Sequence, residues 1–139
     1  MMRSIRVNDA AFTLLEVMIV CGLVAVLMAM AVPSYRQYVV RAHRSAAIEQ
    51  LLSAVGCQQR IYAAEFHFDT RRCLPTDEKG RYEFRFEPAD SPEVSVFTVT
   101  ADPLASQSSD VCGSLSLDHR GAKQISGPSE RSAACWQSR

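Results

Sequence analysis

The sequence lacks the patterns that usually mark an enzyme or a metal protein. It contains no glycine-rich phosphate-binding loop, and spacing alone places no serine, histidine and aspartate together. His43 is expected on a helix, exposed to solvent. A zinc set made of His67, Asp69 and Cys73 lacks the paired CxxC spacing of common zinc sites. We therefore predict a protein that is not an enzyme and has neither a cofactor nor a metal.

The sequence also lacks net charge, since Lys and Arg number 15 and Asp and Glu number 15. Bulk charge gives no support for a nucleic-acid partner. An apolar segment is missing from the first eleven residues, which include Arg3 and Arg6. In a secretory signal peptide the apolar segment precedes the cleavage site, whereas here it follows the basic leader. We therefore expect the apolar segment to remain in the mature protein.

The apolar segment spans residues 12–33 and contains one charge, Glu16. No polar stripe recurs at helical spacing between Val17 and Val32, as it would in a surface helix of a soluble domain. As a helix the segment covers about 30 Å, the hydrocarbon thickness of a bilayer. The sequence therefore predicts a membrane anchor. An ionised Glu16 inside it needs a positive partner, which a cut leaving a free amine nearby would supply.

The helical pattern continues beyond the anchor and becomes amphipathic. Apolar residues recur every three or four positions between Ala47 and Val55, with polar residues such as Arg44 set among them. We predict one helix over residues 12–64. Pro33 lies inside it, either as an adaptable kink or as a marker of the membrane exit.

The remainder, residues 65–139, is long enough for one small domain. Residues 65–81 have the turn signals of a connecting loop. Alternating or β-branched residues then predict three or four antiparallel strands packed on the helix, an α+β fold. The expected strands are Tyr82–Phe86, Val94–Ala101, Ser114–Asp118 and a short strand ending at Ile125.

Four cysteines outside the anchor allow three pairings. Sequence order favours Cys57 with Cys73 and Cys112 with Cys135. Each bond would close a loop of about 17 to 24 residues, worth roughly 3 kcal/mol in the loop-entropy model. A domain of this size benefits from such cross-links.

The start of the chain resembles the class III signal of type IV pilins and pseudopilins. The residues that carry the likeness are Ala11–Glu16, after a short basic leader, and Pro33 at the end of the apolar run. The resemblance implies that a prepilin peptidase removes residues 1–11 by cutting between Ala11 and Phe12 and then methylates the Phe12 amine. Ala11 stands where the family usually has glycine. The resemblance also implies that Glu16 pairs with the terminal amine of a neighbouring subunit during assembly.

The C-terminal region resembles the minor pilins called PilE. The likeness rests on the stretches Gln107–Asp118 and Gly121–Lys123 and on the Cys135-Trp136 pair near the end. It implies the type IV pilin fold, a long kinked helix on a small antiparallel sheet with a disulfide-closed C-terminal loop. We expect Trp136 to pack over the disulfide.

Together the two resemblances imply a structural minor pilin that supports twitching motility, adhesion or DNA uptake. The expected division is a leader (1–11), a transmembrane and polymerisation half-helix (12–33), an amphipathic half-helix (34–64) and a globular domain (65–139). The implied partners are other pilin subunits, the prepilin peptidase and the assembly platform of the inner membrane. The chain would sit in the inner membrane with a periplasmic C-terminal domain, and later in an extracellular pilus. The alternatives are a type II secretion pseudopilin and an uncleaved membrane-anchored binding domain.

A loose group of basic residues surrounds the second cysteine, namely Arg71, Arg72, Lys79 and Arg81. Some pilins of competence systems bind DNA through such a surface. A solvated loop is the commoner explanation of such a group, and DNA contact is the less favoured interpretation.

Overall fold

The computed structural model describes residues 13–77 and 79–137. Two compact units are distinguished, Met1–Gln37 and Tyr38–Arg139. Helix α1, Leu14–Glu65, contributes residues to both units. A continuous helix is confirmed over the described part of the predicted range, and it continues through Pro33.

In the first unit, α1 begins next to Thr13, whose hydroxyl accepts a hydrogen bond from the Glu16 amide at 3.2 Å. This contact satisfies one of the free amide groups at the helix start, and Glu16 is the acidic residue of the first turn. All residues from 13 to 37 are exposed, including the long apolar run. By length and composition, α1 is able to cross a membrane.

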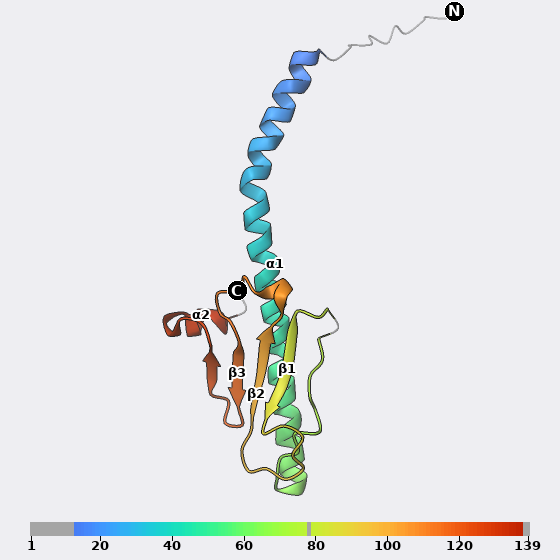
Figure 1. The fold of residues 1–139 in the computed structure, drawn as a ribbon, viewed down its shortest axis with the longest axis vertical. Coiled ribbons are helices and arrows are strands. Elements are labelled where there is room, and N and C mark those ends of the chain that lie inside the picture. Colours follow the sequence, from blue (N-terminus) through green and yellow to red (C-terminus); the bar gives the residue numbers. More distant parts are fainter. Residues whose placement is uncertain (1–12, 78, 138–139) are drawn as a thin grey trace, which may run out of the picture. The chain divides into compact units, whose positions relative to one another are not determined.

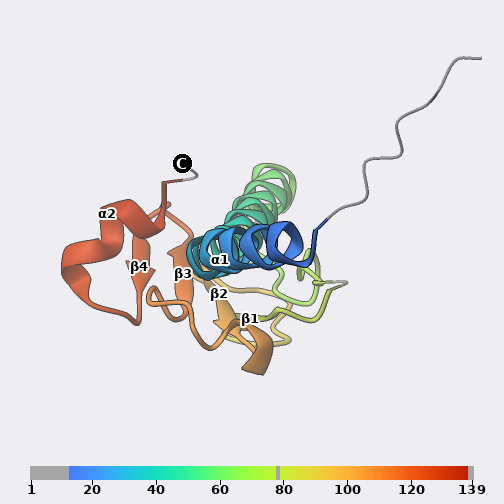
Figure 2. The same ribbon diagram turned by 90° about the horizontal axis from the view of Figure 1, so that it is seen from above.

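The second unit contains a four-stranded antiparallel sheet in the order β1-β2-β3-β4 (Figure 1). The strands are β1 Tyr82–Glu87, β2 Thr98–Pro103, β3 Leu115–Asp118 and β4 Lys123–Ile125. Short helical turns follow β2 and β4, namely η1 Ala105–Gln107, η2 Ser129–Arg131 and α2 Ser132–Cys135. The predicted α+β arrangement of a long helix and a small antiparallel sheet is therefore confirmed. Figure 2 shows α2 beside β4, at the opposite edge of the sheet from β1.

The core of this unit lies between the C-terminal part of α1 and one face of the sheet. In β1 the side chains alternate between buried and exposed, as the alternating sequence predicts. Apolar residues of α1 at helical spacing cover the buried face. The central contributors are Ala47, Leu51 and Val55 from α1, Phe84 and Phe86 from β1, Val99 and Ala101 from β2, and Leu115 and Leu117 from β3.

The second strand lies further along the chain than its β-branched composition suggests. The prediction was Val94–Ala101, and the strand is Thr98–Pro103. Val94 instead forms an isolated bridge with Phe68 in the loop after α1. The valines before Phe97 therefore belong to the connection between β1 and β2, which the bridge to Phe68 holds in place.

Candidate functional site

The segment between α1 and β1, residues 66–81, folds back along the helix, and Gln58 anchors it there. Gln58 is fully buried, and its amide nitrogen donates to the carbonyls of Asp69 and Arg72 at 2.6 and 2.7 Å. Its amide oxygen accepts from the Asp69 N–H at 3.0 Å. A single side chain thus supplies the partners that a loop over a helix would otherwise lack. We call residues 66–81 the α1–β1 loop.

A disulfide joins the same loop to the same part of the helix. Cys57 is bonded to Cys73, with 6.1 Å between the two Cα atoms. The corresponding distance in the Cys112–Cys135 disulfide is 5.8 Å. Because Gln58 follows Cys57 directly, the covalent bond and the three hydrogen bonds fix the loop at one place on α1. The pairing is the one that sequence order favoured, and Cys112–Cys135 also matches.

The two arginines of the predicted basic group that lie in this fixed part are paired with carboxylates. Arg71 contacts both carboxylate oxygens of Asp69, at 3.0 and 3.1 Å. Arg72 contacts Glu65 at 2.9 Å. Each arginine lowers the pKa of its partner below the usual range through the hydrogen bond. Both arginine side chains remain about half exposed, at 54% and 50%, and can therefore reach an external anion.

Lys79 and Arg81 lie at the other end of the loop, near His43. Burial lowers the pKa of His43, and the charges of Arg81 and Lys79 lower it further, whereas Asp77 acts in the opposite direction. His43 and Gln58 are separated by roughly 22 Å along the helix at 1.5 Å per residue. The basic residues therefore do not form one cluster around Cys73 but mark the two ends of the loop.

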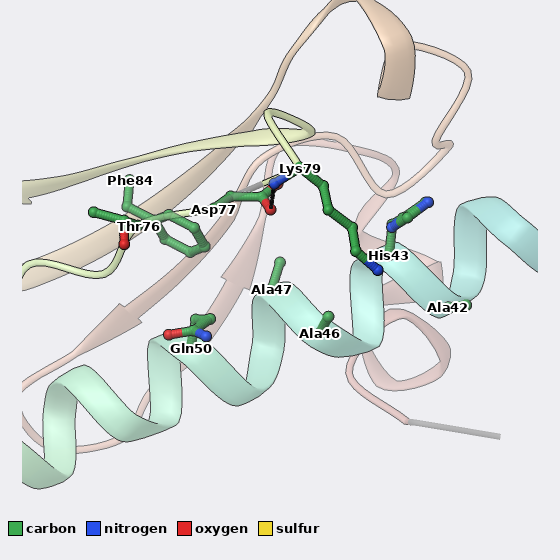
Figure 3. Close-up of a pocket in the computed structure, with 9 residues that line it drawn as sticks. All are labelled: Ala42, His43, Ala46, Ala47, Gln50, Thr76, Asp77, Lys79 and Phe84. Carbon is green, nitrogen blue, oxygen red and sulfur yellow. Dashed lines mark hydrogen bonds between the residues drawn. The ribbon is translucent and has the colours of Figure 1, made fainter.

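A groove of about 500 Å³ lies between α1 and this second end of the loop. Figure 3 shows Lys79 and His43 together at one end of it and Gln50, Thr76 and Phe84 at the other. Small helix residues form the side along α1, namely Ala42, Ala46 and Ala47. The groove therefore offers the Lys79 cation and an imidazole of lowered pKa at one end, and an amide, a hydroxyl and an aromatic ring at the other.

Asp77 also lines the groove, but its carboxylate is occupied by the loop itself. One oxygen accepts the Lys79 N–H at 2.9 Å, and the other accepts the amides of Arg81 at 2.7 Å and Tyr82 at 2.9 Å. These three amides hold the turn that enters β1. Burial acts to raise the pKa of Asp77, but these hydrogen bonds outweigh it and hold the pKa below its usual value, so the carboxylate stays ionised.

A buried polar network ties α1 to the segment after β2. The Arg44 guanidinium donates to Asp110 at 2.6 Å and to the Cys112 sulfur at 2.8 Å. The Tyr82 hydroxyl donates to the second oxygen of Asp110 at 2.9 Å. Gln107 donates to the Val40 carbonyl at 2.8 Å. The network fixes the start of the Cys112–Cys135 loop against the helix.

Several polar residues of this unit were misplaced by the sequence pattern. Arg44 was assigned to the polar face of the helix, but it is 8% exposed. Gln107 and Asp110 lie in a segment whose polar composition is typical of a solvated loop, yet both are buried. Gln58 was not predicted as a core residue because it is polar. It stands four and three positions after Ala54 and Val55, so its place in the helical period was the available signal.

The assembly residues predicted from the signal motif all belong to the range of the first unit. Ala11 and Phe12 fall outside the described residues. Glu16 is exposed in the first turn of α1, and Pro33 is inside the helix. Their predicted roles involve other subunits and stay predictions. Within residues 13–77 and 79–137, no group of three or more His, Cys, Asp and Glu side chains is arranged to hold a metal ion.

Two family models match the chain. One is described as "Type IV minor pilin ComP, DNA uptake sequence receptor" and matches residues 33–116. This range includes the α1–β1 loop, the groove and the buried network. The other is described as "Prokaryotic N-terminal methylation motif" and matches residues 6–32.

Solved structures give the same picture of the fold. A type IV pilin from Shewanella oneidensis is 27% identical, with a TM-score of 0.51, over 60% of this chain and 89% of that one. The non-core minor pilin PilV of Neisseria meningitidis is 18% identical, with a TM-score of 0.50, over 66% of this chain and 91% of that one. The second likeness concerns the fold alone.

Proposed function

Because the chain belongs to the family of ComP type IV minor pilins, we propose that it is a minor pilus subunit whose α1–β1 loop binds duplex DNA. The observation that carries the proposal is the family match over residues 33–116, which includes the whole loop. The family is structural and not enzymatic, and the prediction of a type IV minor pilin is confirmed. The matching family is ComP, whereas the sequence pointed to PilE.

DNA binding, which the sequence left as the less favoured interpretation, gains support from the shape of the loop. The loop runs along α1 with Arg71 and Arg72 at one end and Lys79 and Arg81 at the other. His43 and Gln58, the positions on α1 beside these two ends, are roughly 22 Å apart, which corresponds to about six base pairs of duplex at 3.4 Å per pair. A duplex laid along the loop would meet cations at both ends. Phosphates would compete with Asp69 and Glu65 for the two arginines, and the affinity would fall as salt rises.

The test compares arginines that differ in position but not in exposure. Arg71→Gln with Arg72→Gln removes one end of the loop's charge. Arg85→Gln is the matched control, because Arg85 is 56% exposed on β1 and also contacts carboxylates, Glu87 and Asp102. The full processed chain in neutral detergent is titrated with a fluorescent duplex at several salt concentrations.

We expect the double variant to bind more weakly and to flatten the plot of log K against log salt by about 0.9 for each lost phosphate contact. The Arg85 variant should retain the wild-type slope. Equal slopes for the wild type, the double variant and the control would contradict a role for this end of the loop.

The N-terminal unit would supply assembly. We propose that the chain is cut between Ala11 and Phe12, that Phe12 is methylated, and that Glu16 pairs with the amine of a neighbouring subunit. The match to the N-terminal methylation motif supports this proposal. The prepilin would stand in the inner membrane with its C-terminal unit in the periplasm, and then move into the extracellular pilus.

Mass analysis of the N-terminal peptide tests this step. A chain that begins at methylated Phe12 in sheared surface fibres would support processing. A Glu16→Lys variant should insert in the membrane but stay out of the fibres. A chain that retains residues 1–11 and occurs in membranes alone would instead favour the uncleaved anchor.

A further inference from the structure

The groove between α1 and the α1–β1 loop has the size and lining of a ligand site, and phosphate binding along the loop does not involve it. Its volume of about 500 Å³ lies within the ~300–1,000 Å³ range of small-molecule sites. Lys79 and His43 lie at one end, and Gln50, Thr76 and Phe84 lie at the other (Figure 3). The two ends thus differ in chemistry, one being cationic and the other neutral and hydrogen-bonding.

We propose that this groove takes one unpaired nucleotide of a DNA strand, with its phosphate at Lys79 and His43 and its base at Gln50 and Phe84. The inference rests on the proposed DNA binding. It deepens that function by assigning a place where a base, rather than the backbone, is contacted.

The cationic end suits a phosphate because its carboxylate is already satisfied. Both oxygens of Asp77 accept backbone amides, so Asp77 holds the turn and does not neutralise Lys79 directly. The charges of Arg81 and Lys79 lower the pKa of His43 in addition to its burial, and Asp77 opposes them without reversing the direction.

The neutral end suits a base edge. A glutamine amide offers an NH2 donor and a carbonyl acceptor, a combination that matches N1 and the N6 amino group on the pairing edge of adenine. Gln50 is exposed on α1, so its side chain is available to a ligand. The Phe84 ring forms part of the lining and offers an apolar contact to a base. The alanines along α1 leave the room between the two ends.

An unpaired nucleotide fits this groove better than a paired one. A base inside a duplex has its pairing edge occupied, and extruding it costs a few kcal/mol. A nucleotide at a strand end or in a single-stranded overhang carries a much smaller cost. The structure therefore predicts that an overhang adds affinity to that of the duplex alone.

The decisive experiment compares blunt duplexes with duplexes that carry one unpaired adenine nucleotide or one abasic residue. With the wild-type chain in detergent, the adenine overhang should bind about tenfold more tightly than the blunt end, and the abasic overhang should lose most of that gain. Gln50→Leu should reduce the ratio of overhang to blunt affinity towards one. Gln59→Leu is the control, because Gln59 is an exposed glutamine on the same helix outside the groove.

A second variant fills the groove without changing any charge. Ala46 is exposed, so Ala46→Leu adds bulk to the groove without disturbing the core. It should abolish the overhang gain as Gln50→Leu does. A wild-type chain that binds blunt and overhanging duplexes equally would overturn the nucleotide site and leave the DNA-binding function standing.

A spectroscopic readout separates the two proposals further. Deoxyadenosine monophosphate is added to the chain, and the histidine ring signals are followed with pH. Binding should raise the pKa of His43 and leave the ring signals of His67 and His119 unchanged. The His43→Gln variant identifies which signal belongs to His43. If no duplex binds but this shift occurs, the function fails and the nucleotide site stands. Absence of the shift contradicts the nucleotide site.

Discussion

The anchor of the α1–β1 loop allows a sharp prediction about stability. Gln58→Leu keeps a similar volume but removes the contacts to Asp69 and Arg72. The N–H and C=O of the buried Asp69 would then lack partners, which costs about 1–3 kcal/mol each. Burial of the leucine side chain offsets about 1–2 kcal/mol. These terms span about 0–5 kcal/mol, and we expect the free energy of unfolding to fall by about 2–3 kcal/mol, the middle of that range.

Thermal unfolding followed by circular dichroism, with the disulfides oxidised, measures this effect. For a unit of this size, 1 kcal/mol corresponds to roughly 4–8 °C in Tm, so Gln58→Leu should lower Tm by about 8 °C or more. Gln59→Leu changes an exposed neighbour and should stay within about 4 °C of the wild type. Amide exchange at Asp69 should also become faster in the Gln58 variant. Equal Tm values for the two variants would refute the role of Gln58 as the loop's anchor.

Further predictions concern the buried network and the disulfides. Asp110→Ala should cost about 3–5 kcal/mol in urea unfolding, because it leaves the Arg44 charge buried without its partner, and Arg44→Met added to it should recover part of the loss. Burial, followed by the charge of Asp110, raises the pKa of Tyr82 above its ordinary value of 10.0. The unfolded state therefore ionises first, and stability should fall as pH rises above about 10, an effect that Tyr82→Phe removes. Replacing Cys57 and Cys73 by alanine should cost about 3 kcal/mol, and a loss below 1 kcal/mol would contradict their stabilising role.

Much of the fold followed from repeating patterns. The period of apolar residues predicted α1 almost to its end at Glu65. The anchor is apolar on all faces and the amphipathic part on one face, and both patterns persist over many turns. The alternation in Tyr82–Glu87 predicted β1 for the same reason. Patterns that repeat over several residues report local geometry well, since one misplaced residue does not hide them.

The helical period continues through Arg44 and Gln58, but it does not show how two polar residues come to be buried. Arg44 is charged and stands beside His43, which is typical of a solvated helix face, yet a carboxylate from 66 positions later in the chain makes its burial stable. Gln58 is buried for an equivalent reason, through a loop 11 to 14 residues away. The burial of these two polar residues depends on partners far away in the sequence. A single sequence contains both partners but does not show that they contact each other.

The basic residues illustrate the same limit on function. Arg71 and Lys79 are close in sequence and suggested one positive cluster. Gln58 holds one end of the loop and His43 lies beside the other, and these two positions on α1 are roughly 22 Å apart. This separation changes the interpretation from a local charge cluster to a strip that matches several base pairs of DNA.

The most direct test of the central proposal uses the pilus itself. Surface fibres are sheared from cells that make this chain and from cells that lack it, and equal masses of fibre are mixed with labelled duplex DNA at low and high salt. Fibres that contain the chain should retain the DNA at low salt and release it as salt rises. Equal retention by fibres with and without the chain would contradict the proposal that this subunit is the DNA-binding component of the pilus.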